Sequence, residues 1–156
     1  MQAEHLIDIA IQFATQLNET FPSRVICKPE TTGRVFADVY HEPMPDGSGV
    51  YLFHFADRDV FYIGKTNTQE RTFEKRVWAH FYAPALTESG QREIRAKHID
   101  VAKLAPEEQK GLTGMQFRID YFKVDPPELA DLFEVYLQSI CFLRDGKLPK
   151  CNAQFG

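Results

Sequence analysis

Apolar residues recur every three to four positions near both ends of the chain, which is the spacing of one face of an α-helix. The first stripe lies within residues 3–18 and comprises Leu6, Ile9, Ala10, Phe13 and Leu17. A second stripe follows the sequence DPPE, whose prolines suit the first turn of a helix. It comprises Leu129, Leu132, Phe133, Tyr136, Leu137 and Ile140. The pattern predicts a helix in each segment.

The middle of the chain is typical of β-strands instead. Residues 49–55 (GVYLFHF) and 60–64 (VFYIG) are rich in β-branched and aromatic side chains, and the turn-like ADRD separates them. Two such runs joined by about four residues predict a β-hairpin. Alternation in residues 115–124 predicts a third strand. A further strand is a candidate at residues 34–40, before a loop rich in proline and glycine.

The period changes to that of a helix again after Thr72. Phe73, Val77 and Phe81 are four residues apart, so they form one apolar edge, and Arg76 and His80 share a neighbouring face. Residues 90–103 are charged and mixed, and we interpret them as another helix. The predicted order is α–β–β–β–α–α–β–α, which is an α+β class with a small central sheet.

Composition narrows the functional classes. The chain has 156 residues, enough for one domain, and it has no apolar run long enough to span a membrane. Its net charge of −4 argues against a protein that binds nucleic acid by overall positive charge, so any such site must be local. The spacing of Cys27, Cys141 and Cys151 suggests neither a zinc site nor a disulfide framework. Because the first residues are acidic and lack a basic leader, we expect a cytoplasmic protein.

Side chains suited to phosphodiester hydrolysis lie in the hairpin and helices. Such hydrolysis needs a base for water, a cation for the phosphate, a metal for the leaving oxygen and a carboxylate to hold that metal. The candidates are Tyr51, Tyr62, Arg76, His80 and Glu134. Taken singly, each has an ordinary structural interpretation: half-buried strand tyrosines, a solvated helix face paired with Glu70 or Glu74, and an exposed helical glutamate. Their joint order along the chain is what favours a site.

The order GVY, then YIG eleven residues later, then FEKRVWAHF, a lone Glu in a helix and finally LPKCN resembles the GIY-YIG nuclease domain. The helix segment is most similar to the catalytic domain of GIY-YIG homing endonucleases, and the chain is also similar to the nuclease module of the UvrC repair subunit. The resemblance runs from Gly49 to Asn152. It implies a small three-stranded mixed sheet flanked by helices. It divides the chain into an N-terminal helical extension (1–48), which contains no recognisable functional motif, and a nuclease domain (49–156).

The resemblance also implies roles for individual residues. Tyr51 and Tyr62 match the two motif tyrosines that shape the site, one of which helps to activate the attacking water. Arg76 matches the arginine that grips the scissile phosphate, and His80 matches a position occupied by His or Tyr. Glu134 matches the carboxylate that binds one divalent cation, Mg²⁺ or Mn²⁺.

Three further residues match supporting positions: Gly49, Gly64 and Asn152. Lys65, which follows Gly64, is a further supporting candidate because its ammonium could contact a phosphate. The path from YIG to Arg76 is longer than usual, which makes Arg71 a competitor for the arginine role. We prefer Arg76 because it keeps the spacing to His80. The path from Glu134 to Asn152 is also longer, so the assignment of Asn152 is weaker than that of Glu134.

The resulting expectation is a metal-dependent endonuclease that acts on DNA. The alternative is an inactive module of the same fold that binds nucleic acid or a protein partner, which the acidic composition favours. Neither the DNA specificity nor the oligomeric state follows from the sequence. A single site cuts one strand at a time, so double-strand cleavage would need a dimer or two sequential events.

Overall fold

The computed structural model describes residues 1–21, 24–67 and 72–156, with only the backbone at residues 31–32. Its helices are α1 (Ala3–Thr20), α2 (Phe36–Val39), α3 (Phe73–Trp78), α4 (Pro106–Thr113), α5 (Leu129–Asp145) and a 3-10 turn (Val101–Lys103). Its strands are β1 (Ile26–Val35), β2 (Gly49–His54), β3 (Val60–Thr66), β4 (Ala85–Leu86), β5 (Arg92–Glu93) and β6 (Arg118–Asp125). The predicted α+β class is confirmed. Among the described helices, none has both the length and the apolar character needed to cross a membrane.

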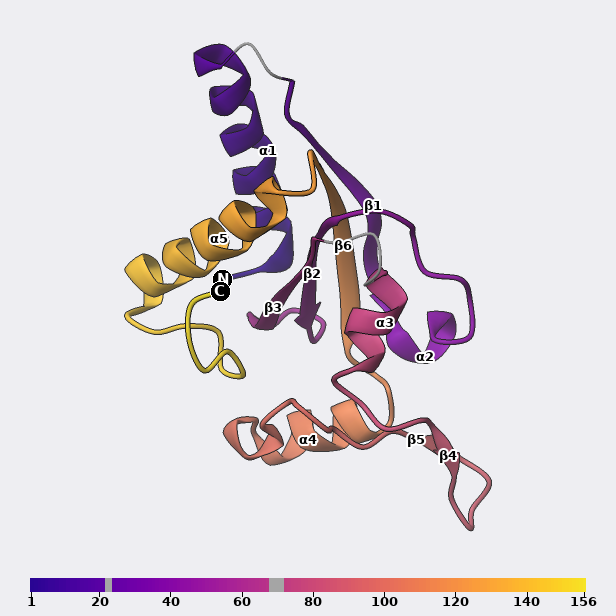
Figure 1. Cartoon of the computed structure of the whole chain (residues 1–156). Coiled ribbons are helices and arrows are strands. Elements are labelled where there is room, and N and C mark those ends of the chain that lie inside the picture. Colours follow the sequence, from indigo (N-terminus) through magenta and orange to yellow (C-terminus); the bar gives the residue numbers. More distant parts are fainter. Residues whose placement is uncertain (22–23, 68–71) are drawn as a thin grey trace.

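The central sheet has four strands in the order β1-β6-β2-β3, and each neighbouring pair is antiparallel. The prediction of a three-stranded mixed sheet was therefore wrong in strand number and in strand direction. The predicted hairpin of β2 and β3 and the predicted third strand, β6, are confirmed. The additional strand is β1, which pairs with β6 along the edge away from β2 (Figure 1).

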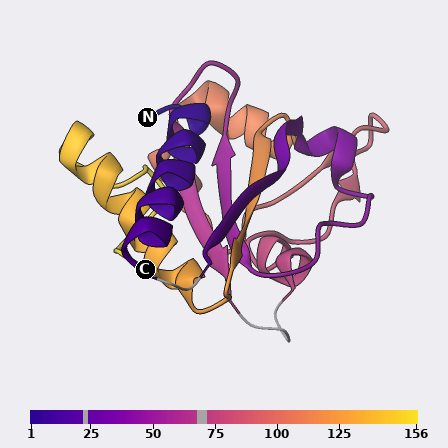
Figure 2. The ribbon, with the colours of Figure 1, turned by 90° about the horizontal axis from the view of Figure 1, so that it is seen from above.

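Helices α1 and α5 cover one face of the sheet, as the view from above shows (Figure 2). Their buried residues share one core with Val50 and Leu52 of β2 and Phe122 of β6. A second, strongly aromatic core lies on the other face. It joins Tyr51 and Phe53 to α2, α3 and the segment around α4. The division at residue 48 stays a prediction about function, since β1 belongs to the same sheet as the rest and α1 to the same core.

Two predicted elements differ from the structure, and one helix was not predicted. The strand predicted at 34–40 was wrong beyond Val35, because the chain leaves the sheet there and forms α2. That short helix buries Phe36 completely, and the Phe36 and Ala37 amides donate to the carbonyls of Phe117 (2.9 Å) and Met115 (2.8 Å).

The helix predicted at 90–103 was also wrong. Residues 81–98 form a hairpin-like arm instead: Phe81 bridges Ala96, the Tyr82 amide donates to the Arg95 carbonyl at 2.9 Å, and β4 pairs with β5 at the far end. Helix α4 follows, and it was not predicted.

Candidate active site

The tyrosine of β2 and the glycine of β3 face each other across the hairpin. Tyr51 pairs with Gly64 in the antiparallel register, and the Tyr51 ring lies over the glycine. A Cβ atom at position 64 would stand 2.4 Å from Cζ of Tyr51, closer than real Cβ contacts occur. The absence of a side chain at Gly64 therefore permits Tyr51 to lie where it does, fully buried.

Tyr51 meets His80 at the end of α3. Its Oη lies 2.7 Å from Nε2 of His80, and both side chains are buried. The sequence predicted Arg76 and His80 on one helical face. In fact α3 ends at Trp78, so His80 lies in the following turn, with its amide donating to the Val77 carbonyl. That turn directs the imidazole inward.

Burial, aided by the nearby charges of Arg76 and His98, lowers the pKa of His80 to about 4. The imidazole is therefore neutral near pH 7, when one of its nitrogens can accept a proton. Among the described residues, Nδ1 of His80 has no hydrogen-bond partner. His98, which the sequence motifs do not single out, thus lies within electrostatic reach of His80.

Tyr62 is the more exposed of the two motif tyrosines. It lies beside His80, with the ring centroids 4.7 Å apart in an edge-on arrangement. Burial raises the pKa of both Tyr62 and Tyr51, the charge of Glu134 raises it further and that of Arg76 lowers it. The two tyrosines, Arg76 and Glu134 therefore lie within electrostatic reach of one another.

Arg76 is half-buried on α3, and its Nε donates to the Lys65 carbonyl at 3.4 Å. It makes no ion pair with any residue in the described part of the chain. A guanidinium held by the backbone but without a carboxylate is free to bind an anion, since its fork of donors matches phosphate oxygens. The competing residue, Arg71, lies outside the described residues, as does Glu70.

Glu134 is buried more deeply than its pattern position suggests, with 4% of its surface exposed. It lies on α5 and faces Lys65 of β3, whose Nζ is 2.9 Å from its Oε2 and 2.8 Å from Oδ1 of Asp131. Burial raises the pKa of Glu134, and Lys65 opposes that shift. The sequence analysis missed Asp131. The available signal was its position three residues before Glu134, which places both carboxylates on one side of a helix.

Two carboxylates beside a substrate phosphate are a ligand set that Mg²⁺ uses in proteins, because the ion keeps several of its waters. Glu134 and Asp131 already share one cation, the Lys65 ammonium. The residues therefore fit a divalent ion, provided that Lys65 turns aside to release the carboxylates. No group of three or more acidic, histidine or cysteine ligands occurs within residues 1–21, 24–67 and 72–156.

Two of the predicted supporting residues fix the backbone around β3 and β2. Asn152 forms two hydrogen bonds with Ile63: its side-chain carbonyl accepts from the amide and its side-chain nitrogen donates to the carbonyl, both at 2.9 Å. The Cys151 amide donates to the Phe61 carbonyl at 2.8 Å. At Gly49, a Cβ would stand 2.1 Å from the Phe122 carbonyl oxygen, so β6 approaches β2 closely there.

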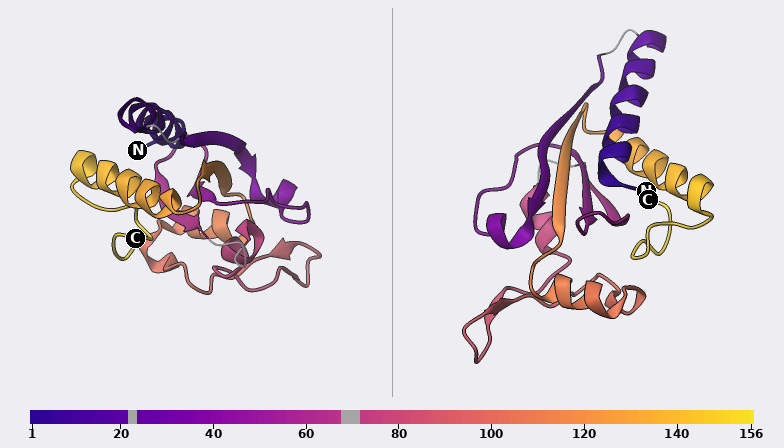
Figure 3. Two further views of the ribbon diagram at one scale, coloured as in Figure 1. Left: turned by 45° about the horizontal axis from the view of Figure 1, so that its top comes forward. Right: turned by 180° about the vertical axis from the view of Figure 1, so that it is seen from behind.

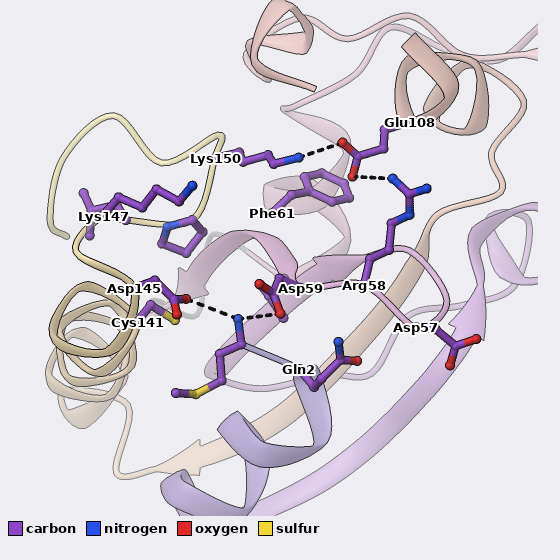
Figure 4. A pocket seen from close by; sticks show the side chains of 14 residues that line it. Gln2, Asp57, Arg58, Asp59, Phe61, Glu108, Cys141, Asp145, Lys147 and Lys150 are labelled. Carbon is purple, nitrogen blue, oxygen red and sulfur yellow. Dashed lines mark hydrogen bonds and ion pairs between the residues drawn. The ribbon is translucent and has the colours of Figure 1, made fainter. Parts of the chain in front are cut away.

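A separate pocket of about 430 Å³ lies near the start of α1 and is lined by charged groups (Figure 4). Its charges largely pair with one another. Glu108 contacts Lys150 at 2.8 Å and Arg58 at 3.6 Å, and the Met1 amino group contacts Asp59 at 2.8 Å. None of Tyr51, Tyr62, Arg76, His80 or Glu134 lines it. The pocket therefore belongs to a different part of the molecule from the candidate site.

Comparison with known proteins adds no identification. The chain matches no protein-family model, no characterised protein and no solved structure.

Proposed function

We propose that the protein is a metal-dependent endonuclease that hydrolyses DNA phosphodiester bonds with a site like that of the GIY-YIG nucleases. The observation that carries the proposal is the hydrogen bond between Tyr51 and a neutral, buried His80, with Arg76 and Glu134 within electrostatic reach. The order of these residues along the chain, which resembles the GIY-YIG domain, supports the same conclusion independently.

The proton of the attacking water would pass to the tyrosine–histidine group. Tyr51 is fully buried and burial raises its pKa, so a stable Tyr51 phenolate is disfavoured. The role of contacting water falls instead to Tyr62, which is partly exposed and stands beside His80. His80 is neutral and its Nδ1 has no partner among the described atoms, so it can accept the proton. Because its pKa is lowered to about 4, it would pass the proton on rather than keep it.

Negative charge that develops on the phosphate would be stabilised by Arg76. Its guanidinium stays charged at any relevant pH and presents several donors in one plane. A divalent cation, when bound at Glu134 and Asp131, would supply the positive charge that stabilises the leaving 3′ oxygen. Lys65 would then gain a second role. Its ammonium, once displaced from the carboxylates, would be available to bind a phosphate oxygen, and its backbone already contacts Arg76.

The ion pair of Lys65 with Glu134 also favours a second candidate, a module that binds nucleic acid without cutting it. In that case Lys65 would stay on the two carboxylates and the chain would retain only the phosphate-binding function of Arg76. The two candidates differ in their need for metal: cleavage requires it and this mode of binding does not.

The test is incubation with supercoiled plasmid and with branched and single-stranded DNA, in Mg²⁺, Mn²⁺ or EDTA. We expect cutting that EDTA abolishes and that Glu134→Gln reduces by at least about 100-fold, because the carboxylate is lost while the side-chain volume is kept. Glu4→Gln, which makes the same change on the exposed face of α1, serves as the control and should leave cutting unchanged. Full activity of Glu134→Gln would overturn the assignment of the site.

A further inference from the structure

The arm formed by residues 81–98 projects from the sheet (Figure 3). Aromatic and basic side chains lie together at its root. Tyr82 is 47% exposed. The guanidinium carbon of Arg95 lies 5.3 Å from the centre of its ring, and Nζ of Lys97 lies 5.7 Å from it. We call Tyr82, Arg95 and Lys97 the arm-root cluster. Arginine and lysine two residues apart on an extended segment lie on one side of it, so both cations reach the same ring.

The two cations of the cluster are not neutralised. Arg95 and Lys97 are exposed and form no ion pair with residues of the described chain, including the flanking carboxylates of Glu93 and Asp100. This local excess of positive charge stands out in a protein whose net charge is −4. A basic pair flanking an exposed aromatic ring suits a nucleic-acid strand, because the cations bind phosphates and the ring stacks on a base.

The position of the arm relative to the candidate site is fixed by the backbone. The amides of Lys97 and His98 both donate to the His80 carbonyl, at 2.7 and 3.2 Å. Ile94 is fully buried in the aromatic core, and its amide donates to the Thr113 carbonyl of α4 at 2.9 Å. The cluster therefore begins two residues after His80 and is held on a packed root rather than on a free loop.

We propose that the arm-root cluster binds an unpaired segment of the substrate strand next to the bond that is cut. Arg95 and Lys97 contact two phosphates, and Tyr82 stacks on a base between them. The substrate class is thus DNA with a single-stranded portion at the site, such as a branched or flapped structure. The inference rests on the proposed function, because the bound strand is a substrate only if the protein cleaves DNA. Binding by the cluster is nevertheless measurable without cleavage.

The experiment is fluorescence anisotropy in EDTA, with a labelled single-stranded oligonucleotide and the same strand in a duplex as probes. Tyr82→Ala should weaken single-strand binding at least about fivefold, the loss of one base–aromatic stack, and should affect the duplex less. Arg95→Gln/Lys97→Gln should weaken it about tenfold and should reduce the slope of log affinity against log salt by about 1.4, the value for two lost phosphate contacts.

Matched controls lie elsewhere on the surface. Phe155→Ala removes an aromatic ring that is 45% exposed. Arg24→Gln/Lys28→Gln removes two exposed cations from the region where β1 begins. Both should leave single-strand binding unchanged.

Unchanged affinity in the Tyr82 and Arg95/Lys97 variants would overturn the proposal, as would equal losses in the controls or no binding by the parent protein. If the variants kept both metal-dependent cleavage and unaltered binding, the proposal for the arm-root cluster would fail and the proposed nuclease function would stand. If the parent protein neither bound nor cleaved DNA, both this proposal and the proposed function would be overturned.

Discussion

A side chain at position 64 would collide with the Tyr51 ring, so a single added methyl group probes the importance of this contact. We expect Gly64→Ala to lower the free energy of unfolding by about 1–3 kcal/mol, the usual cost of overpacking, and to shift Tyr51 away from His80. Chemical denaturation measures the first effect and the rate of DNA cleavage the second.

Gly114→Ala is the matched control for this change. The added Cβ would meet its nearest atom, the Lys110 carbonyl oxygen, at an ordinary 3.5 Å. Equal stability of the two variants would contradict the close approach of Tyr51 to Gly64.

The burial of His80 predicts how the stability of the protein depends on pH. The pKa of His80 is about 4 in the folded chain and near 6.5 in the unfolded one, so between these values the unfolded state binds the extra proton. The contribution of neutral His80 to the free energy of unfolding is complete above pH 6.5. It is lost as the pH falls through the folded pKa of about 4. We expect acidification to lower the free energy of unfolding on the order of 2–3 kcal/mol more in the parent protein than in His80→Gln.

Urea denaturation at a series of pH values would measure this difference. The pair of His54 and Asp120 is common to both proteins and cancels in the comparison. Parallel stability curves would contradict a neutral, buried His80.

The sequence suffices to nominate single residues, but it does not show their partners. Tyr51, Tyr62, Arg76, His80 and Glu134 all emerge from their order and spacing. The pairing of Lys65 with Asp131 and Glu134 does not, because it depends on how α5 lies across β3. The burial of Glu134 was underestimated for a related reason: Leu132, predicted to be in the apolar stripe, is 42% exposed, so the buried face of α5 is rotated toward the glutamate.

At the scale of elements, Asn152 joins the last loop to β3. We expect Asn152→Ala to lower the free energy of unfolding by about 1–3 kcal/mol through the loss of its two hydrogen bonds with Ile63, and to reduce DNA cleavage because β3 carries Tyr62 and Lys65. Denaturation, amide hydrogen exchange at Ile63 and a cleavage assay would measure these effects.

Asn18 offers a close control, because its side chain likewise bonds both the amide and the carbonyl of one residue, Val25. Asn18→Ala should cost similar stability and spare cleavage. If both variants lost activity equally at temperatures where both remain folded, Asn152 would have no special link to the site.

The sequence predicted the elements with strong periodicity and missed those that depend on distant partners. Helices α1, α3 and α5 follow from regular apolar spacing. The β2–β3 hairpin follows from two runs of β-branched and aromatic residues joined by a short turn. Strand β1 has little regular apolar spacing. Its pairing with β6 is interrupted by register shifts after Pro29, so an alternating pattern is not maintained along it. The arm at 81–98 has mixed polarity that is compatible with a helix, and only the burial of Ile94 and its bond to α4 fix the extended form.

At the scale of the whole molecule, the first 48 residues are part of the fold. Strand β1 pairs with β6, and Leu6, Ala10 and other residues of α1 are buried against the sheet and α5. We expect residues 49–156 expressed alone to lack cooperative unfolding, because Phe122 and Val124 would lose their cover. Circular dichroism during thermal unfolding tests this, and a cooperative transition in the shorter chain would contradict it.

The segment that holds Asn152 and Cys151 also bears on self-association. Strand β3 is an edge of the sheet, and an open edge is a template on which a second chain adds a strand. The bonds from Cys151 to Phe61 and from Asn152 to Ile63 occupy the outward backbone groups of β3 at these residues. Cys151 and Asn152 thus leave fewer free backbone groups on this edge of the sheet, and we expect their removal to promote aggregation, which turbidity at high concentration would measure.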